Sequence, residues 1–311
     1  MSQTGRDGPL FDIPSADRGT IADMSSPQPG VLAPVPAAGR FLTLTLARGA
    51  SVADAVAALA ALPIDDGIVV GVGASLLEGR TSLLGALRPF PSISAPGVSF
   101  PSTQGAAWVF LRGDDAAALL VRARGLVARL EGLLDVAEDI AAFRYDTGRD
   151  LSGYEDGTEN PTGDDAARAA LDADGASFVA VQRWVHDLAR FEGMSAIARD
   201  HVIGRNRETN DELPDAPESA HVKRAAQESF EPPAFMLRRS MPYGDLGRNG
   251  LYFVAYGASL DAFEHVLTRM AGVVDGITDA LLTFSRAETG GYYWCPPTRE
   301  GRLDLRALAT R

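Results

Sequence analysis

The order in which strand-like and helix-like segments follow one another is the feature that most constrains how this chain can fold. In the first half of the chain, apolar or alternating segments surround two segments that have a helical period. They give the order strand–helix–strand–strand–helix–strand, over residues 40–48, 51–62, 67–77, 106–113, 114–134 and 140–147. This order is typical of the ferredoxin-like unit, an antiparallel sheet with helices on one face. We expect Ser51 to cap the first helix and either Asp114 or Asp115 to cap the second.

The second half of the chain repeats this order more loosely. Its predicted strands cover residues 176–187, 235–241, 251–257 and 290–296, and its helices cover 188–200 and 258–272. In both halves a strand that ends in glycine leads directly into a helix, as in FLRGDDAAALL and FVAYGASLDAF. The predicted fold class is therefore α+β, with duplicated ferredoxin-like units whose antiparallel sheets pack against each other.

The less periodic segments divide the chain into five parts. The start of the chain is rich in Pro, Gly, Ser and Asp, which is typical of a poorly ordered arm. A polar linker separates the two repeating halves. The predicted parts are an arm at 1–38, a first half at 39–148, a linker at 149–177, a second half at 178–297 and a tail at 298–311.

Charge and cysteine content exclude several classes of protein. The net charge is −12 and the basic residues form no stripe, which argues against a nucleic-acid partner. The single cysteine, Cys295, excludes an intramolecular disulfide framework and a multi-thiolate metal cluster within one chain. The start lacks the pattern of a secretory signal, and no window reaches the ~18 apolar residues of a membrane span. We therefore expect a soluble, cytoplasmic protein without a membrane partner.

Two long polar loops, at residues 148–165 and 204–224, are the candidates for function, because long loops in compact domains are usually functional or disordered. The first loop contains GYEDGTENP at residues 153–161. Its Asp-Gly and Asn-Pro pairs form turns, so an acidic surface turn is one interpretation. A calcium loop is another, although the spacing does not fit an EF-hand. The chain contains neither a glycine-rich phosphate cradle nor the GxSxG motif of serine hydrolases.

The chain has four histidines, and one of them stands apart. His186 lies in a predicted strand and His265 in a predicted helix, where we expect structural roles. His201 ends a helical segment and can interact with its last carbonyls. His221 follows the second polar loop, so it is the candidate for a metal ligand or a catalytic base. The four histidines have no HExxH or other close metal-ligand spacing.

Two adjacent arginines lie in the strand predicted at 235–241. Successive side chains of a strand point to opposite faces. One of Arg238 and Arg239 therefore faces inward, where it needs a polar or anionic partner. A solvated strand end is the simpler alternative for the pair.

Together these segments resemble the dye-decolourising peroxidase family of haem enzymes, and especially its bacterial intracellular branch. The resemblance rests on GYEDGTENP, the histidine of SAHVKR about 65 residues later and RRSMPYG 17 residues after that. Two further stretches, QPGVLAPVPAAGRFLTLTL and TDALLTFSRAETGGYYWCPP, extend it over roughly residues 28–297 in the family's order. The family's fold is a pair of ferredoxin-like halves with haem in the second, which agrees with the repeated order.

The resemblance implies one haem b per chain, with His221 as the axial ligand of the iron. A ligating imidazole usually donates its other N–H to an acceptor. The family's carboxylate acceptor matches Asp279 in GITDALL, for which an exposed helix position is the alternative.

On the opposite side of the haem, the resemblance implies a set of catalytic residues. Asp156 matches the group that moves a proton between the oxygens of hydrogen peroxide. Arg238 matches the arginine that stabilises the developing charge, and Ser240 completes the family's Arg-x-Ser or Arg-x-Asn pattern. Arg239 is then expected to point away.

Four further residues are expected to contact the cofactor. Gly157 and Thr158 follow the catalytic aspartate, where glycine lets the backbone approach the porphyrin closely. Leu251 and Phe253 lie two apart on the next predicted strand. They are predicted to line the pocket, and a role in the core is the alternative.

The implied function is the reduction of hydrogen peroxide through a ferryl intermediate and the oxidation of dyes, phenols or other small donors. Electrons could reach large donors through surface aromatic residues, for which the candidates are Trp184, Trp294, Tyr292 and Tyr293; each could instead belong to the core. The acidic surface could attract Mn(II). We expect a homo-oligomer, and the terminal GRLDLRALATR contains no convincing encapsulin-docking peptide.

Two other classes of function remain open from the sequence. A haem-binding or haem-handling protein with incidental peroxidase activity would have nearly the same sequence. A cofactor-free ferredoxin-like dimer that serves as an interaction module would bind no haem, and it would leave the inward arginine and the GYEDG loop unexplained.

Overall fold

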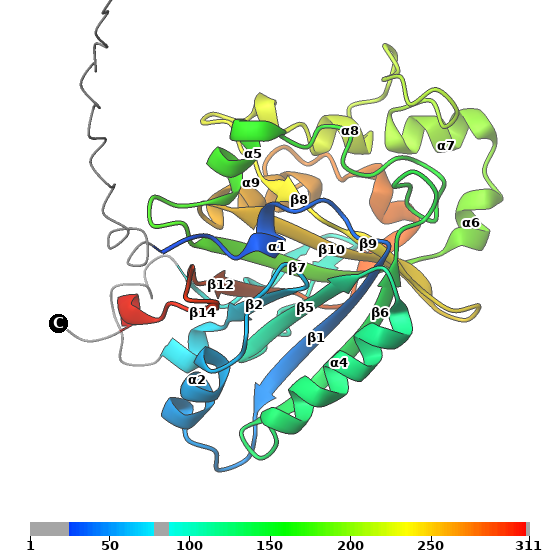
Figure 1. Ribbon diagram of the computed structural model, residues 1–311. Helices are drawn as coiled ribbons and strands as arrows, with labels where there is room; N and C mark the ends of the chain where they lie inside the picture. Colours follow the sequence, from blue (N-terminus) through cyan, green and yellow to red (C-terminus); the bar gives the residue numbers. More distant parts are fainter. Residues whose placement is uncertain (1–24, 78–86, 309–311) are drawn as a thin grey trace, which may run out of the picture.

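The predicted strands and helices occur in the predicted order, and three short strands, at residues 93–95, 98–100 and 285–287, are present in addition (Figure 1). The computed structural model describes residues 25–77 and 87–308. The first half contains β1 (Ala38–Leu46), α2 (Val52–Ala60), β2 (Ile68–Val72), β3 (Ile93–Ala95), β4 (Val98–Phe100), β5 (Ala107–Gly113), α4 (Ala116–Arg129) and β6 (Leu134–Phe143). The second half contains β7 (Ser177–His186), α6 (Leu188–Glu192), α7 (Ala196–Ile203), α8 (His221–Arg224), β8 (Leu237–Arg238), β9 (Met241–Gly244), β10 (Asn249–Gly257), α9 (Asp261–Met270), β11 (Ser285–Ala287) and β12 (Gly291–Cys295).

Shorter elements flank the two halves and connect them. They are α1 (Pro29–Leu32), α5 (Gly163–Ala170), β13 (Thr298–Arg299), β14 (Arg302–Leu303) and the 3₁₀ turns η1 (Ala74–Leu77), η2 (Gln227–Ser229), η3 (Ala280–Thr283) and η4 (Arg306–Leu308).

The long strands of the two halves are joined into one antiparallel sheet. The first half has the order β6–β1–β5–β2, and the second has β12–β7–β10, with β8 and β9 along the far edge of β10. Two single residue pairs join the halves, Val72 with Trp294 and Ala142 with Tyr243. The α+β class with antiparallel strands is confirmed. The two expected sheets pack against each other through apolar side chains of both halves. They are also joined at their edges, because the edge strands of each half pair with the other half, which satisfies their backbone groups.

Each face of this sheet buries a different set of apolar side chains. One face packs against α2, α4 and α9. The other forms an aromatic cluster to which both halves contribute, with Phe41, Trp108, Phe110, Tyr252, Tyr256 and Tyr293. Within it the rings of Phe41 and Tyr252 stack with their centroids 4.1 Å apart. The two halves therefore share one core.

The helix caps form as the sequence predicts. The Ser51 side chain accepts a hydrogen bond from the backbone N–H of Asp54 at the start of α2. Asp115, rather than Asp114, caps α4 and accepts from the N–H groups of the next turn. These bonds satisfy donors that a helix start otherwise leaves unpaired.

Several predicted elements are divided, shortened or shifted. The helix predicted at 114–134 ends at Arg129, and the strand predicted at 140–147 is β6, which begins at Leu134 and ends at Phe143. The helix predicted at 188–200 is two short helices, α6 and α7, separated at Gly193. The strand predicted at 67–77 ends at Val72 and continues as a 3₁₀ turn. The strand predicted at 235–241 is interrupted between β8 and β9, because the N–H of Val254 donates to the Ser240 hydroxyl instead of to a carbonyl of the neighbouring strand.

The arm predicted at 1–38 is partly folded against the sheet. Residues 25–38 include α1, and the buried Gln28 side chain bonds both backbone groups of Val70 and the carbonyl of Pro296, at 2.8–2.9 Å. Residues 1–24 lie outside the described residues. In the tail predicted at 298–311, β13 and β14 form a hairpin that ends before residues 309–311, which are also outside the described part.

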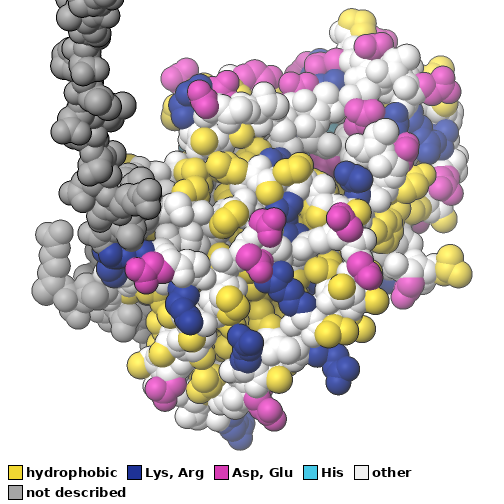
Figure 2. All heavy atoms as spheres, viewed as in Figure 1, with side chains coloured by type: hydrophobic (Ala, Val, Ile, Leu, Met, Phe, Trp, Pro, Cys, Tyr) yellow, Lys and Arg dark blue, Asp and Glu magenta, His cyan; other side chains and the backbone are white. Residues whose placement is uncertain are grey.

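The molecular surface fits the charge pattern of the sequence. On the face shown in Figure 2, acidic and basic side chains are interspersed, and the basic ones form no continuous stripe. Within residues 25–77 and 87–308, no helix is both long enough and apolar enough to cross a membrane.

Candidate active site

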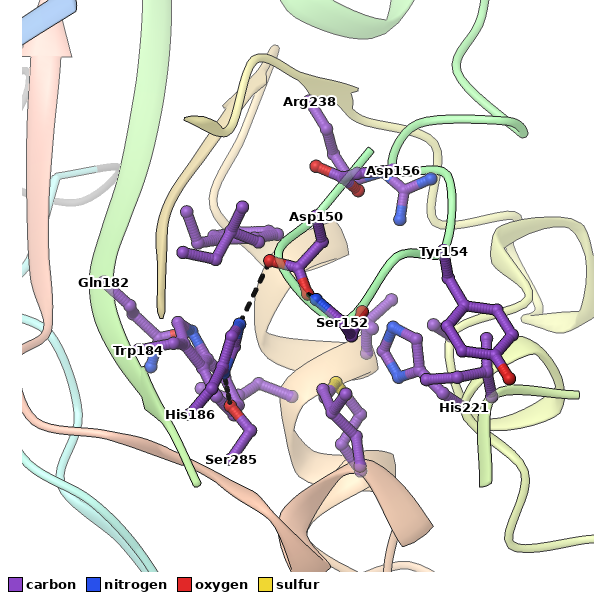
Figure 3. A pocket seen from close by; sticks show the side chains of 18 of the residues that line it. Asp150, Ser152, Tyr154, Asp156, Gln182, Trp184, His186, His221, Arg238 and Ser285 are labelled. Atoms are coloured by element: carbon purple, nitrogen blue, oxygen red, sulfur yellow. Dashed lines mark hydrogen bonds and ion pairs between the residues drawn. The ribbon is translucent and has the colours of Figure 1, made fainter. Parts of the chain in front are cut away.

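A mainly apolar cavity lies in the second half, between the helical face of the sheet and the two polar loops (Figure 3). Its volume is about 930 Å³, part of it open to solvent. Strands β7 and β10, helix α9 and the loop at 150–156 supply most of its wall. The apolar lining includes Leu251, Phe253, Phe263, Val266 and Met270. The predicted pocket residues Leu251 and Phe253 therefore face this cavity.

On one side of the cavity, His221 is held by a buried carboxylate. His221 is the first residue of α8, and its Nδ1 lies 2.8 Å from Oδ2 of Asp279. The Asp279 side chain is fully buried, and its other oxygen accepts from the N–H of Leu281 at 2.8 Å. Among the described residues, nothing bonds Nε2 of His221, which lines the cavity. Asp279 caps the turn η3, so the alternative of an exposed helix residue is wrong.

Asp156 and Arg238 line the same cavity and lie together at the top of Figure 3. Asp156 comes from the loop at 153–161, and Arg238 comes from β8. Arg239 points to the other face, as expected, and its guanidinium donates to the carbonyls of Leu32 and Ala33 at 3.0 and 2.7 Å. Burial lowers the pKa of Arg239. The inward arginine of the pair is therefore Arg238.

Two donors on the cavity wall are buried without a partner in the described part of the chain. They are Nε of Arg238 and Nε2 of Gln182. An unpaired buried donor costs about 1–3 kcal/mol, so such groups are rare in folded proteins. Both donors therefore indicate a site that takes a polar ligand.

Three other predicted residues lie outside the cavity lining. Gly157 and Thr158 border a more open hollow that adjoins the cavity and shares Asp156 and Arg238 with it. Gly157 has a φ of +82°, which favours glycine, and the Thr158 hydroxyl accepts from Asn210 at 3.0 Å. Ser240 is buried beneath the wall, where its hydroxyl accepts from the Val254 N–H.

A polar group that the sequence analysis missed lies at another end of the cavity. The buried His186 bonds Ser285 Oγ through Nδ1 at 2.7 Å and Asp150 Oδ1 through Nε2 at 3.1 Å. Burial alone would raise the pKa of Asp150, but the charge and hydrogen bond of His186, with bonds from Ser152, lower it to about 2. The strand period was the available signal, since Gln182, Trp184 and His186 alternate along β7 and all line the cavity.

The aromatic residues suggested for surface electron transfer are not on the surface. All four are buried: Trp184, Trp294, Tyr292 and Tyr293. They lie on β7 and β12, which are interior strands of the sheet. The described residues also contain no cluster of three or more His, Cys, Asp or Glu side chains that could hold a metal ion.

The chain is similar in sequence to known proteins. Residues 147–300 match the family described as Dyp-type peroxidase, C-terminal. The dye-decolorizing peroxidase of Mycobacterium tuberculosis is 31% identical over 298 residues, which cover 87% of this chain and 88% of that protein. The dye-decolorizing peroxidase of Rhodococcus erythropolis is 31% identical over 297 residues, which cover 87% of this chain and 86% of that protein.

Solved structures show the same similarity in three dimensions. DyPB from Rhodococcus jostii RHA1 superposes with a TM-score of 0.80 and 33% identity, covering 88% of this chain and 96% of that one. The dye-decolorizing protein of Vibrio cholerae superposes with a TM-score of 0.79 and 30% identity, and the superposition covers 88% of this chain and 97% of that one. Variants of the Rhodococcus jostii protein have been solved in complex with haem, and one in complex with manganese.

The fold and the cavity define an enzyme of the peroxidase class. The chain belongs to the dye-decolourising peroxidase family.

Proposed function

We propose that this enzyme is a haem peroxidase that reduces hydrogen peroxide and oxidises dyes, phenols or other small donors. The observation that carries the proposal is the free Nε2 of His221, directed into an apolar cavity while Nδ1 bonds a buried carboxylate. Neutral imidazole is the usual axial ligand of haem iron, with its second nitrogen hydrogen-bonded. Haem b, one per chain, would supply the redox chemistry with peroxide when bound.

The lining of the cavity fits such a cofactor. Apolar side chains from β10 and α9 would pack against a flat macrocycle, and the unpaired donors of Arg238 and Gln182 would meet polar groups. His221 is the proposed ligand. His186 lines the same cavity, but both of its ring nitrogens already have partners.

The residues of this chain divide the chemistry between them. Asp279 keeps the proton on Nδ1 of His221, which makes the imidazole a stronger electron donor. Asp156 takes a proton from one oxygen of peroxide and returns it to the other. The Arg238 guanidinium stabilises the negative charge that develops as the oxygens separate. Ser240 supports the position of Arg238 from behind the wall through its bond to β10. Gly157 and Thr158 shape the approach to the cofactor.

The repeated fold and the wider setting are also part of the proposal. Both halves place their strands in the order fourth, first, third, second, which supports duplicated ferredoxin-like units at 39–148 and 178–297, joined by a linker at 149–177. We propose a cytoplasmic homo-oligomer. Light scattering of the purified holoprotein tests the oligomer, and a monomer would contradict it.

The other two classes of function are not favoured. A cofactor-free interaction module has no use for a cavity with two unpaired donors and an imidazole with a free nitrogen. A haem-handling protein has no need of a proton-transfer group and a cation together on one wall.

The test of the proposal is an absorption spectrum of protein expressed with ample haem, before and after one equivalent of hydrogen peroxide. We expect a Soret band that changes within seconds and returns when a phenolic donor is added. A Soret band that does not respond to peroxide would favour haem handling. Absence of the band after reconstitution would contradict haem binding.

A further inference from the structure

One side chain connects the loop that carries Asp156 to the strand that carries Arg238. The side-chain amide of Asn160 bonds both backbone groups of Arg238. Its Oδ1 accepts from the Arg238 N–H at 2.8 Å, and its Nδ2 donates to the Arg238 carbonyl at 3.0 Å. The two residues are 78 positions apart in the sequence, so this contact is a tertiary one.

Arg238 needs such a partner because β8 is an edge strand only two residues long. On its inner side β8 pairs with β10, where Arg238 lies opposite Ala255 and the next N–H donates to Val254. On its outer side no strand of the described chain is present, and the Asn160 amide supplies the donor and acceptor that a neighbouring strand would give. The backbone from which the Arg238 side chain projects is therefore fixed on both sides.

Asn160 is also fixed relative to Asp156. Its backbone N–H donates to the Gly157 carbonyl at 2.9 Å, which closes a tight turn directly after Asp156. Gly157 has a φ of +82°, and a Cβ at this position would lie 2.7 Å from Nδ2 of Asn160. The glycine is thus required both by the backbone conformation and by the space that the Asn160 amide occupies.

We propose that Asn160 is a positioning residue that holds Arg238 and Asp156 in a fixed relation on one wall of the cavity. It acts through the backbone of Arg238 and does not line the cavity itself. This inference rests on the proposed function, in which Arg238 stabilises anionic oxygen. A displacement of about 1 Å at such a group costs up to a hundredfold in rate.

The test compares Asn160→Ala, Arg238→Leu and the double variant as holoproteins. The first readout is the dissociation constant of fluoride at the ferric haem, which measures stabilisation of a bound anion without turnover. The second is the rate constant of the Soret change with hydrogen peroxide. We expect Asn160→Ala to weaken fluoride binding and slow the peroxide reaction about tenfold, and Arg238→Leu to do so about a hundredfold. The double variant should match Arg238→Leu, because Asn160 acts only through Arg238.

Glu159→Gln is the matched control. Glu159 is the neighbouring side chain on the same loop, and it pairs with Arg205 at 2.5 Å without contacting Arg238. We expect it to leave both readouts unchanged. If Asn160→Ala does not retain haem, Asn160→Asp replaces it, since it keeps an acceptor for the Arg238 N–H while Arg239 Nη1 still donates to the carbonyl at 3.1 Å. Asn160→Asp should weaken fluoride binding and slow the peroxide reaction less than Asn160→Ala does. In a protein that also carries Arg238→Leu, Asn160→Asp should change neither readout further.

The outcomes separate this inference from the proposed function. If Arg238→Leu changes both readouts and Asn160→Ala changes neither, Asn160 has no positioning role. The same conclusion follows if Asn160→Ala slows the reaction by an equal factor with and without Arg238. If Arg238→Leu itself leaves both readouts unchanged, the role of Arg238 in the proposed function is wrong.

Discussion

Two histidines that line one cavity each bond a carboxylate, and they differ in the partner of the second ring nitrogen. His186 has partners on both nitrogens, Asp150 and Ser285. His221 bonds Asp279 through Nδ1 and leaves Nε2 free within the described structure. An iron ligand needs a free nitrogen lone pair, so only His221 can ligate without breaking existing bonds. The hydrogen bonds of the two ring nitrogens therefore distinguish the proposed ligand, His221, from the structural His186.

His221→Ala should give a folded protein that does not retain haem. The imidazole is the proposed axial ligand of the iron, so its removal takes away the coordinate bond between protein and haem. The apolar wall of the cavity remains, so the fold should be retained. The haem-to-protein ratio and the circular dichroism spectrum of the purified variant check this. His265→Ala is the control, because that side chain stacks on Phe230 outside the cavity. Haem at wild-type occupancy in His221→Ala would contradict the ligand assignment.

Arg238→Leu and Asp156→Asn should each keep haem and slow the reaction with peroxide, by about a hundredfold or more for the arginine. Arg239→Leu removes one bond to the Arg238 carbonyl but leaves Asn160 on the Arg238 backbone, so it should slow this rate far less than Arg238→Leu. It should lower the free energy of unfolding by about 1–3 kcal/mol, because the carbonyls of Leu32 and Ala33 lose their donor. Stopped-flow absorption and chemical denaturation measure the two effects. Damage to the rate from Arg239→Leu alone would mean that the wrong arginine has been assigned.

Stability should fall in acid through Asp150. Its pKa is lowered from 3.8 to about 2 in the folded protein, so the folded state is favoured while the carboxylate is charged. This contribution, of about 2 kcal/mol, is present above pH ~4 and is lost as the pH falls from ~4 to ~2. Urea denaturation between pH 2 and 6 should show this loss in the wild type and a flatter profile in Asp150→Asn. Equal slopes in both proteins would contradict the assignment.

At the level of strands, side-chain amides bond backbone groups that have no neighbouring strand, at a short edge strand and at a junction between two strands. Asn160 serves the outer edge of β8, and Gln28 lies where β2 meets β12. An amide carries both a donor and an acceptor, so it can replace one residue of a missing strand. Among the described residues, the strands of the two halves pair through a single residue pair at each junction, Val72 with Trp294 and Ala142 with Tyr243. The hydrogen bonds of Gln28 therefore contribute to holding β2 against β12.

Gln28→Ala should lower the free energy of unfolding by about 2–4 kcal/mol, because it leaves both backbone groups of Val70 and the Pro296 carbonyl without this partner. Guanidinium denaturation of the holoprotein measures the change. Leu246→Ala, at a fully exposed side chain, should leave stability within about 0.5 kcal/mol of the wild type. A loss below about 1 kcal/mol for Gln28→Ala would show that water replaces the amide at the junction.

At the scale of the whole molecule, one aromatic cluster ties the two halves together. Phe41 from β1 stacks on Tyr252 from β10, and Trp108 from β5 donates to the Tyr252 hydroxyl at 3.1 Å. Tyr252 lies on the face of β10 opposite to the cavity-lining Leu251 and Phe253. The first half therefore supports the wall of the cavity, although none of its described residues lines that cavity.

Phe41→Ala should destabilise the whole protein by about 3–5 kcal/mol, since the ring is fully buried between residues of both halves. Unfolding followed by tryptophan fluorescence and by the Soret band should give coincident curves in the wild type, because the halves share a core. Two separated transitions would show that the second half holds haem on its own.

The amino-acid sequence was sufficient to predict the α+β class, the helix caps and the family, and to single out His221, Asp156 and Arg238. These predictions rest on local periodicity and on short motifs, both of which depend on residues that are close together in the sequence. Only the tertiary structure joins the two sheets and turns His186 toward the cavity. It buries Asp279 beside His221, where the family resemblance had placed it. It also placed Asn160 against Arg238. Such contacts connect residues 36 to 99 positions apart, and only the packing of the sheet, loops and helices brings them within hydrogen-bonding distance.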